Sequence, residues 1–194
     1  MTDRSETFAR VLKLEPGRTA LLVVDMQRGF LLPGEAMEVP PAREIVPRIR
    51  ALVDGFRARR LPVVFTEFVY SQAAPLLVGE LHPEHKPETI DGLRPLPGEL
   101  VVRKRWYDGF AGTPLDGALR ARGVTTLVVT GTMTDLCVLA TVIGAFNREY
   151  RVTVVEDGVA TLWPEIQRAT LDIIGRAYGR VVAAKDIAEE VSAC

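Results

Sequence analysis

Short apolar runs alternate with amphipathic helical segments along most of this chain. The apolar runs predict six strands, at residues 20–24, 62–66, 100–102, 126–130, 151–155 and 181–184. Helical patterns follow at residues 42–60, 114–122, 134–148 and 165–178, and a short amphipathic segment ends the chain. Alternating strands and helices are typical of βαβ units. The pattern therefore predicts a doubly wound, Rossmann-like α/β fold, with a six-stranded parallel sheet and helices on both faces.

One long segment shows neither a helical nor a strand period. It runs from Tyr70 to Gly98 and contains five prolines. Loops of this length are uncommon in compact domains and often cover a site or contact another subunit. Because the segment leaves the carboxyl end of the second predicted strand, it can cover that edge of the sheet. An irregular surface excursion or a subunit contact fits the pattern equally well.

Length and composition narrow the class of protein. The 194 residues fit one domain spanning residues 1–194, and 47% of them are hydrophobic. A net charge of −1 gives no electrostatic signature of nucleic-acid or anionic membrane binding. No apolar run is long enough to cross a membrane, and the N-terminal residues lack the apolar core of a signal peptide. Two cysteines make no disulfide framework, so we expect a cytoplasmic protein.

Three chemically complementary residues directly follow predicted strands or the turns after them. They are Asp25, Lys104 and Cys137. Each has an ordinary alternative role: an aspartate often forms a turn, a lysine in a basic cluster is usually solvated, and a lone cysteine is often a small core residue. The carboxyl ends of parallel strands, however, share one edge of the sheet, where ligands bind. The sequence thus predicts a carboxylate, an ammonium and a thiol in one crevice.

The environment expected for Cys137 favours a reactive thiol. Thr134 can act as the N-cap of the helix predicted at residues 134–148, which places Cys137 in the first helical turn. The positive end of a helix and a nearby ammonium group both favour the thiolate. We therefore expect the pKa of the Cys137 thiol to be lowered, with the Asp25 carboxylate available as a base.

Three ordered motifs carry a resemblance to a known family. They are VVDMQ at residues 23–27 followed by Phe30, KRWYDGF at residues 104–110, and GTMTDLCV at residues 131–138. Together they resemble the isochorismatase-like cysteine hydrolases, a superfamily that includes nicotinamidases, N-carbamoylsarcosine amidase, and ureidoacrylate and biuret hydrolases. The likeness extends over about residues 18–187. It implies the same doubly wound α/β fold that the hydrophobic pattern predicts.

The resemblance implies a catalytic triad of Asp25, Lys104 and Cys137. In such a triad Cys137 attacks an amide or carbamoyl carbon, Asp25 accepts the thiol proton and passes it to the leaving amine, and Lys104 keeps Asp25 ionised. The resemblance also implies a non-proline cis peptide bond at Thr132–Met133. The backbone N–H groups of Met133 and Cys137 would form the oxyanion hole.

The same resemblance assigns three residues to the substrate side of the site. Phe30 and Tyr107 would be walls of the pocket, and Gln27 would brace the loop of Asp25 next to the substrate. The nicotinamidases of this superfamily carry a histidine cluster that holds a metal. This chain has only His82 and His85. Because two histidines without further ligands in a standard spacing make a poor site, we expect neither a metal nor another cofactor.

These observations predict a hydrolase that acts on carbon–nitrogen bonds other than peptide bonds. Its substrate would be a small amide, carbamoyl or ureido compound, cleaved through a thioester. Two alternatives share the scaffold: a vinyl-ether hydrolase of isochorismatase type, and a catalytically silent binding protein. The resemblance also suggests a homodimer or a homotetramer. The motifs do not select the substrate, because the pocket would be shaped by the segment at residues 70–98.

Overall fold

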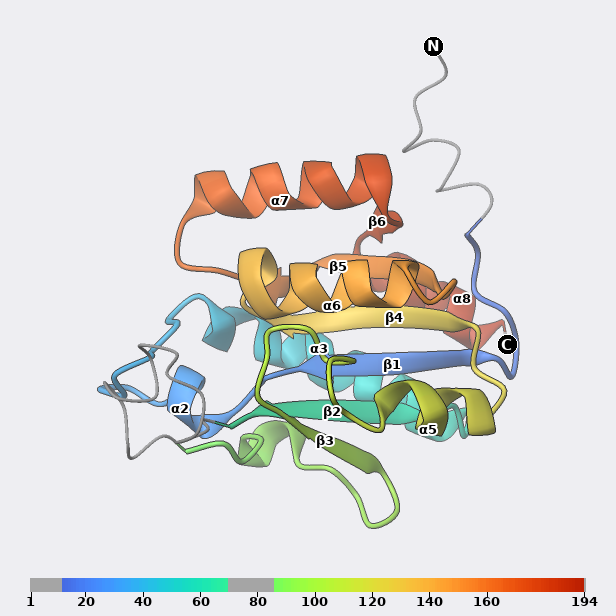
Figure 1. Cartoon of the computed structure of the whole chain (residues 1–194), viewed down its shortest axis with the longest axis horizontal. Helices are drawn as coiled ribbons and strands as arrows, with labels where there is room; N and C mark the ends of the chain where they lie inside the picture. Colours follow the sequence, from blue (N-terminus) through green and yellow to red (C-terminus); the bar gives the residue numbers. More distant parts are fainter. Residues whose placement is uncertain (1–11, 70–85, 194) are drawn as a thin grey trace.

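Six parallel strands form one sheet in the order β3-β2-β1-β4-β5-β6 (Figure 1). The computed structural model describes residues 12–69 and 86–193. Helices cover both faces of the sheet, so the predicted doubly wound fold is confirmed. The strands are β1 (Thr19–Val24), β2 (Val63–Phe68), β3 (Leu100–Lys104), β4 (Thr126–Thr132), β5 (Arg151–Ala160) and β6 (Arg180–Val182).

The helices divide between the two faces of the sheet. One face carries α3 (Ala42–Ala58) and α8 (Ala184–Ser192), which lie behind the sheet in Figure 1. The other face carries α5 (Leu115–Ala121), α6 (Leu139–Phe146) and α7 (Pro164–Ala177). Shorter turns complete the described chain, namely α2 (Arg28–Leu31), the 3₁₀ turn η1 (Asp91–Leu93) and the π turn η2 (Thr134–Val138).

The core has two layers because successive side chains of a strand point to opposite faces of the sheet. In β1, Leu21 and Val23 pack on the side of α3, whereas Leu22 and Val24 pack on the side of α5 and α6. Both faces are covered, so every residue of β1 is buried. This double burial explains why the strands read as continuous apolar runs instead of alternating patterns.

Several strands extend further at their carboxyl ends than the apolar runs predict. Strand β2 continues through Glu67 and Phe68, and β3 includes Lys104 as its last residue. The polar residues remain in the strands because their backbones pair: Glu67 is opposite Arg103 in the ladder, and Phe68 is opposite Lys104. At the other edge of the sheet β6 is shorter than predicted, because Ala184 already begins α8.

The predicted helix at residues 134–148 begins differently from the prediction. The chain enters the π turn η2 before α6, and the N–H group of Val138 donates to the carbonyl of Met133, five residues back, at 3.0 Å. Met133, not Thr134, occupies the N-cap position. The Thr134 hydroxyl is buried without a hydrogen-bond partner among the described residues. The assignment of Thr134 as N-cap was therefore wrong, because the first turn is wider than an α-helical turn.

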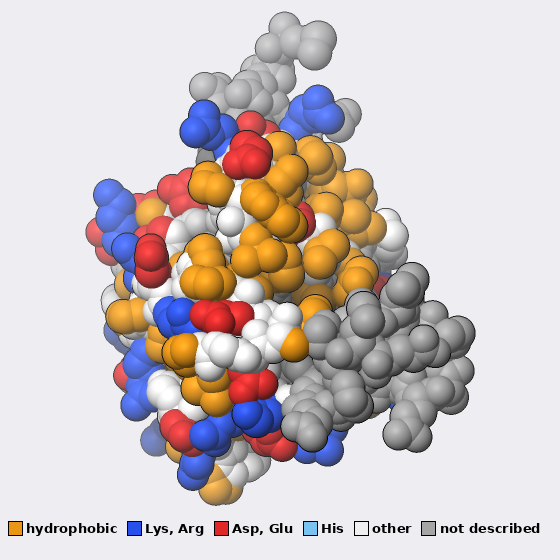
Figure 2. All heavy atoms as spheres, turned by 90° about the vertical axis from the view of Figure 1, so that its left-hand side faces the viewer, with side chains coloured by type: hydrophobic (Ala, Val, Ile, Leu, Met, Phe, Trp, Pro, Cys, Tyr) orange, Lys and Arg blue, Asp and Glu red, His pale blue; other side chains and the backbone are white. Residues whose placement is uncertain are grey.

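The carboxyl ends of the strands lie together at the left of Figure 1. Figure 2 views the molecule from that side, and hydrophobic side chains gather over the upper part of this view. None of the described helices combines the length and the apolar character needed to cross a membrane.

Close contact between β4 and β1 depends on Gly131. Its φ is +117°, and a Cβ atom there would lie 2.0 Å from the carbonyl oxygen of Val24. We expect Gly131→Ala to lower the free energy of unfolding by about 3 kcal/mol or more, because the clash is with backbone and the φ is strained. In Gly117→Ala, within α5, the new methyl group meets no atom within 4 Å. In this control the free energy of unfolding, measured with urea, should rise by about 0.5–1 kcal/mol. Equal effects of the two substitutions would contradict this account of Gly131.

Candidate active site

A buried ion pair joins the ends of β1 and β3. Asp25 follows β1 with a φ of 49°, and its Oδ2 atom lies 2.6 Å from Nζ of Lys104. Both side chains are 0% exposed. Charged groups are rarely this buried unless they are paired, since each must give up its hydration. The structure thus brings two of the three predicted triad residues into direct contact.

Further polar groups complete the surroundings of this pair. The hydroxyl of Thr66, on β2, donates to Oδ1 of Asp25 at 2.6 Å. The Asp25 backbone N–H points back to Thr66, 3.2 Å from its carbonyl oxygen and its hydroxyl. The Lys104 ammonium donates to the carbonyl of Trp106 at 3.2 Å and lies 4.9 Å from the centre of the Phe68 ring. Both oxygens of the Asp25 carboxylate therefore have a partner.

Cys137, the third predicted triad residue, lies in η2 and is 5% exposed. Burial raises the pKa of its thiol, the Asp25 carboxylate raises that pKa further by charge and hydrogen bonding, and Lys104 opposes both. The expected lowering of the pKa is therefore wrong in direction. Proximity to an ammonium group was foreseen, but burial and the neighbouring carboxylate outweigh it. These surroundings therefore favour the protonated thiol over the thiolate.

Lys104 keeps its charge in spite of its burial. Burial alone would lower the pKa of this lysine, but the charge of Asp25 and the interaction with Cys137 more than offset that effect, so the pKa is raised. A charged ammonium group beside Asp25 is the state that the predicted triad would require.

Gln27 holds the turn after β1 against the end of β2. Its side-chain amide donates to the carbonyl of Phe68 at 3.1 Å and accepts from the N–H of Phe68 at 2.8 Å. The Gln27 side chain is fully buried, and its own N–H donates to the carbonyl of Asp25. This geometry matches the predicted bracing of the Asp25 loop. Contact between Gln27 and a substrate remains a prediction.

The other residues assigned to the substrate side differ in exposure. Phe30 is 4% exposed in the core layer beside α3. Tyr107 is 38% exposed, and its ring centre lies 6.1 Å from that of Phe68, which packs against Lys104. The side chain of Met133 is partly buried against the core layer beside α3. The peptide bond between Thr132 and Met133 is cis, at the predicted position.

Two hydroxyl groups that the sequence did not single out anchor the turn carrying Cys137. Thr161, just after β5, donates from its hydroxyl to Oδ1 of Asp135 at 2.5 Å. Thr132 donates from its hydroxyl to the carbonyl of Ala160 at 3.0 Å. The first bond ties η2 to the residue that follows β5, and the second ties the last residue of β4, just before η2, to the last residue of β5. Because Asp135 is two residues before the thiol, these contacts hold Cys137 in place. The only sequence signal was polar residues at the ends of buried strands.

The long segment after β2 is described only from residue 86 onward. Thr89 donates to Glu67 from its N–H at 2.9 Å and from its hydroxyl at 3.1 Å, and it forms an isolated bridge with Gln27. These contacts tie the returning chain to the edge that carries the site. Tyr70, His82 and His85 lie outside the described residues. Within residues 12–69 and 86–193, no cluster of three His, Cys, Asp or Glu side chains is arranged to hold a metal.

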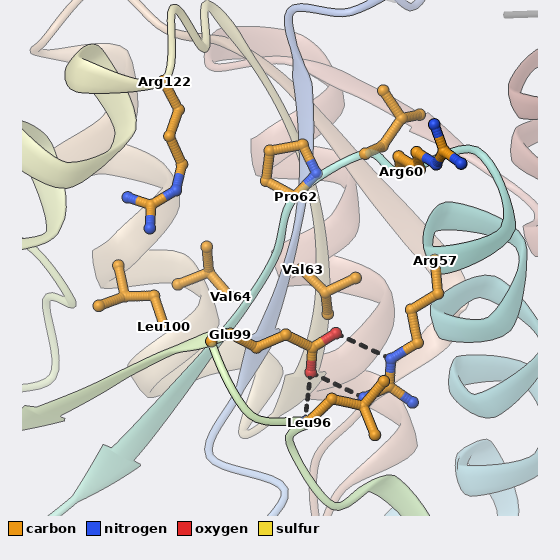
Figure 3. A pocket seen from close by; sticks show the side chains of 11 residues that line it. Arg57, Arg60, Pro62, Val63, Val64, Leu96, Glu99, Leu100 and Arg122 are labelled. Atoms are coloured by element: carbon orange, nitrogen blue, oxygen red, sulfur yellow. Dashed lines mark hydrogen bonds and ion pairs between the residues drawn. The ribbon is translucent and has the colours of Figure 1, made fainter.

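A separate cavity of about 380 Å³ lies at the opposite, amino ends of β2 and β3 (Figure 3). Its lining includes Arg57 and Glu99, which form a two-bond ion pair at 2.8 Å for each bond, and the N–H of Leu96 donates to the same carboxylate. None of the triad residues lines it. The cavity is therefore not part of the candidate site.

Comparison with known proteins identifies the family. The model of the isochorismatase domain matches residues 19–186. The chain is 34% identical to the ureidoacrylate amidohydrolase RutB of Methylobacterium radiotolerans, over 88% of this chain and 78% of that protein.

Solved structures agree with this match. A cysteine hydrolase from Pseudomonas syringae pv. phaseolicola superimposes with a TM-score of 0.86 at 30% identity, covering 93% of this chain and 95% of that one. N-carbamoylsarcosine amidase from Thermoplasma acidophilum superimposes with a TM-score of 0.76 at 34% identity, covering 86% of this chain and 96% of that one.

This chain belongs to the isochorismatase family. The amidohydrolase names of its relatives confirm the predicted enzyme class, a hydrolase of carbon–nitrogen bonds other than peptide bonds.

The hydrogen bond from Thr66 to Asp25 should contribute to the free energy of unfolding. Thr66→Val keeps the shape of the side chain but leaves Oδ1 of a buried carboxylate without its donor. We expect a loss of about 1–3 kcal/mol in the free energy of unfolding, measured with urea. Thr66→Ser keeps the hydroxyl, so its free energy of unfolding should fall clearly less than that of Thr66→Val. Equal losses in the two variants would show that the hydroxyl contributes nothing.

The ionisation of Cys137 should respond to Asp25 in a defined direction. In a Cys194→Ala background, the pH dependence of iodoacetamide alkylation reports Cys137 alone, since the sequence has two cysteines. The wild-type thiol should titrate above the ordinary value of about 8.5. Asp25→Asn should lower its pKa, because it removes the carboxylate charge and leaves Lys104.

Asp135→Asn is the matched control for this titration. Asp135 is near in sequence but is not among the groups that shift the Cys137 pKa, and an asparagine oxygen can still accept from Thr161. The pKa of Cys137 in this control should equal its pKa in the protein with Asp135 unchanged. A thiol pKa that stays constant or rises in Asp25→Asn would contradict the geometry of the site.

Proposed function

We propose that this chain is a cysteine amidohydrolase that cleaves a carbon–nitrogen bond of a small amide, carbamoyl or ureido compound through a thioester at Cys137. The observation that carries the proposal is the fully buried pair of Asp25 and Lys104, which acts on the Cys137 thiol. Relatives named as a ureidoacrylate amidohydrolase and an N-carbamoylsarcosine amidase support this substrate class.

In the proposed first step, the sulfur of Cys137 attacks the carbonyl carbon of the substrate. Its proton passes to Asp25, whose carboxylate already acts on the thiol by charge and hydrogen bonding. Asp25 then delivers this proton to the leaving nitrogen as the carbon–nitrogen bond breaks. The raised pKa of the Cys137 thiol fits this order of steps, because the base is needed only at the moment of attack.

The negative charge on the carbonyl oxygen needs donors during this step. We assign that role to the backbone N–H groups of Met133, which directly precedes η2, and of Cys137 within η2. Losing one donor of this kind typically lowers the rate by about 10²–10³-fold. Lys104 would keep Asp25 ionised between proton transfers and add positive potential near the sulfur.

The second proposed step returns the enzyme to its resting state. A water molecule gives a proton to Asp25 and attacks the thioester carbon. The carbon–sulfur bond breaks, the acid or carbamate product leaves, and the proton passes from Asp25 to the sulfur. The net reaction adds one water across the carbon–nitrogen bond, and no oxidant, reductant or other reactant is consumed.

Ammonia release from a panel of small amides, carbamoyl compounds and ureides tests this function. We expect release with at least one member, and a fall of at least about 1,000-fold in Cys137→Ala, because the nucleophile is lost. Cys194→Ala is the matched control and should keep the wild-type rate, since Cys194 has no proposed role.

Two outcomes would contradict the proposal. Equal release by the wild type and Cys137→Ala would remove Cys137 as the nucleophile. Silence on the whole panel, together with pyruvate release from isochorismate, would favour the vinyl-ether alternative.

A further inference from the structure

Helix α7 is incompletely covered by the other described residues, 12–69 and 86–193. Of its 14 residues only Thr170 and Ile174 are buried, whereas six residues of α3 are buried. A surface helix normally turns its apolar stripe toward the core. In α7, Ile166 and Ile173 are instead 39% and 42% exposed. With Ala169 between them, they form an exposed apolar stripe at positions i, i+3 and i+7.

This stripe is the centre of a larger apolar surface. Ten large hydrophobic side chains are exposed among the described residues, and six of them come from α7, the residues just before it, and η2 and α6, which pack against α7. Figure 2 shows hydrophobic side chains gathered over this end of the molecule. We call these six residues the α7 face: Leu136, Phe146, Leu162, Trp163, Ile166 and Ile173. Exposed apolar side chains that gather on neighbouring elements in this way are typical of an interaction site.

Charged residues beside the stripe indicate what covers it. Glu165 lies at the start of α7 and Arg176 near its end, and both are exposed. They are spaced by about three helical turns, so they lie on the same side of the stripe. Neither forms an ion pair with another residue in the described part of the chain. Arg168 and Asp172 are exposed between them, so acidic and basic residues alternate along α7, and none of the four forms an ion pair within the described residues.

We propose that the α7 face is the surface through which two copies of this chain associate, with α7 of one copy antiparallel to α7 of the other. A twofold axis near Ala169 and Thr170 would place Ile166 opposite Ile173 of the second copy. The same axis brings Glu165 within about 3 Å, along the helix, of Arg176 of the second copy. An apolar centre with a charged rim is the usual anatomy of such an interface.

Self-complementarity is the reason for choosing a second copy over a different protein. A twofold interface uses the same patch on both partners, so each contact occurs twice. The order of charges along α7 satisfies this condition: reversing the helix places Glu165 near Arg176 and Arg168 near Asp172 of the second copy. A foreign partner would need no such relation. The proposal does not depend on the reaction at Cys137.

Sedimentation velocity on the full chain, from about 0.1 to about 100 µM, tests the proposal. We expect a dimer with twice the 21.3 kDa mass of the chain. Ile173→Glu should raise the dimer dissociation constant at least about 100-fold, because the interface contains the substitution twice. Leu96→Glu is the matched control: Leu96 is 51% exposed but lies outside the α7 face, so the dissociation constant should not change. Circular dichroism verifies that each variant is folded.

Charge reversal tests the antiparallel arrangement separately. Glu165→Arg should weaken the dimer, and adding Arg176→Glu to it should restore the dissociation constant.

A wild-type chain that is monomeric at every concentration would overturn the proposal and leave the face for another partner. A dimer that Ile173→Glu does not weaken would also overturn it, by placing the interface elsewhere. Failure of the double variant to recover would overturn the pairing of the two helices.

Discussion

A fully buried ion pair between Asp25 and Lys104 is the interaction on which the candidate site depends. Taking two such charges out of water costs several kcal/mol for each ion, and only close geometry with further hydrogen bonds offsets that cost. Here the charged atoms lie 2.6 Å apart, Thr66 donates to the second carboxylate oxygen, and Lys104 donates to the carbonyl of Trp106. The pair therefore fixes both side chains in position. Together with burial, which raises the pKa of the Cys137 thiol most, the two charged groups shift that pKa in opposite directions, Asp25 upward and Lys104 downward.

The order of the strands explains how this pair forms. Strands β1 and β3 are not neighbours, because β2 lies between them. Lys104 therefore crosses the end of β2, passing over the ring of Phe68, to reach Asp25. Gln27 locks the turn after β1 to the same end of β2 through the Phe68 backbone. On the other side of β1, the absent side chain of Gly131 lets β4 approach closely. The site is thus a consequence of sheet topology at one edge.

Much of this arrangement could be predicted from the sequence, because buried parallel strands are continuous apolar runs and their carboxyl ends meet. That logic placed Asp25, Lys104 and Cys137 at one edge. It could not find the contact of Thr66, since a threonine within an apolar strand gives no sign that its hydroxyl meets a carboxylate. The wide first turn at Thr134 closes through a bond from the Val138 N–H to the Met133 carbonyl, of which the helical pattern gives no sign. The direction of the thiol pKa shift depends on burial and on contact with Asp25, which only the packed structure supplies.

The central claim is that the Asp25–Lys104 pair enables Cys137 to carry the acyl group of the substrate as a thioester. Hydroxylamine, which attacks thioesters, tests this directly during turnover of an amide or ureide. The account predicts that a hydroxamic acid or N-hydroxyurea forms in proportion to hydroxylamine, with the uncatalysed reaction subtracted by means of Cys137→Ala. Continued release of ammonia without any such product at any hydroxylamine concentration would contradict it, because water would then attack the substrate directly.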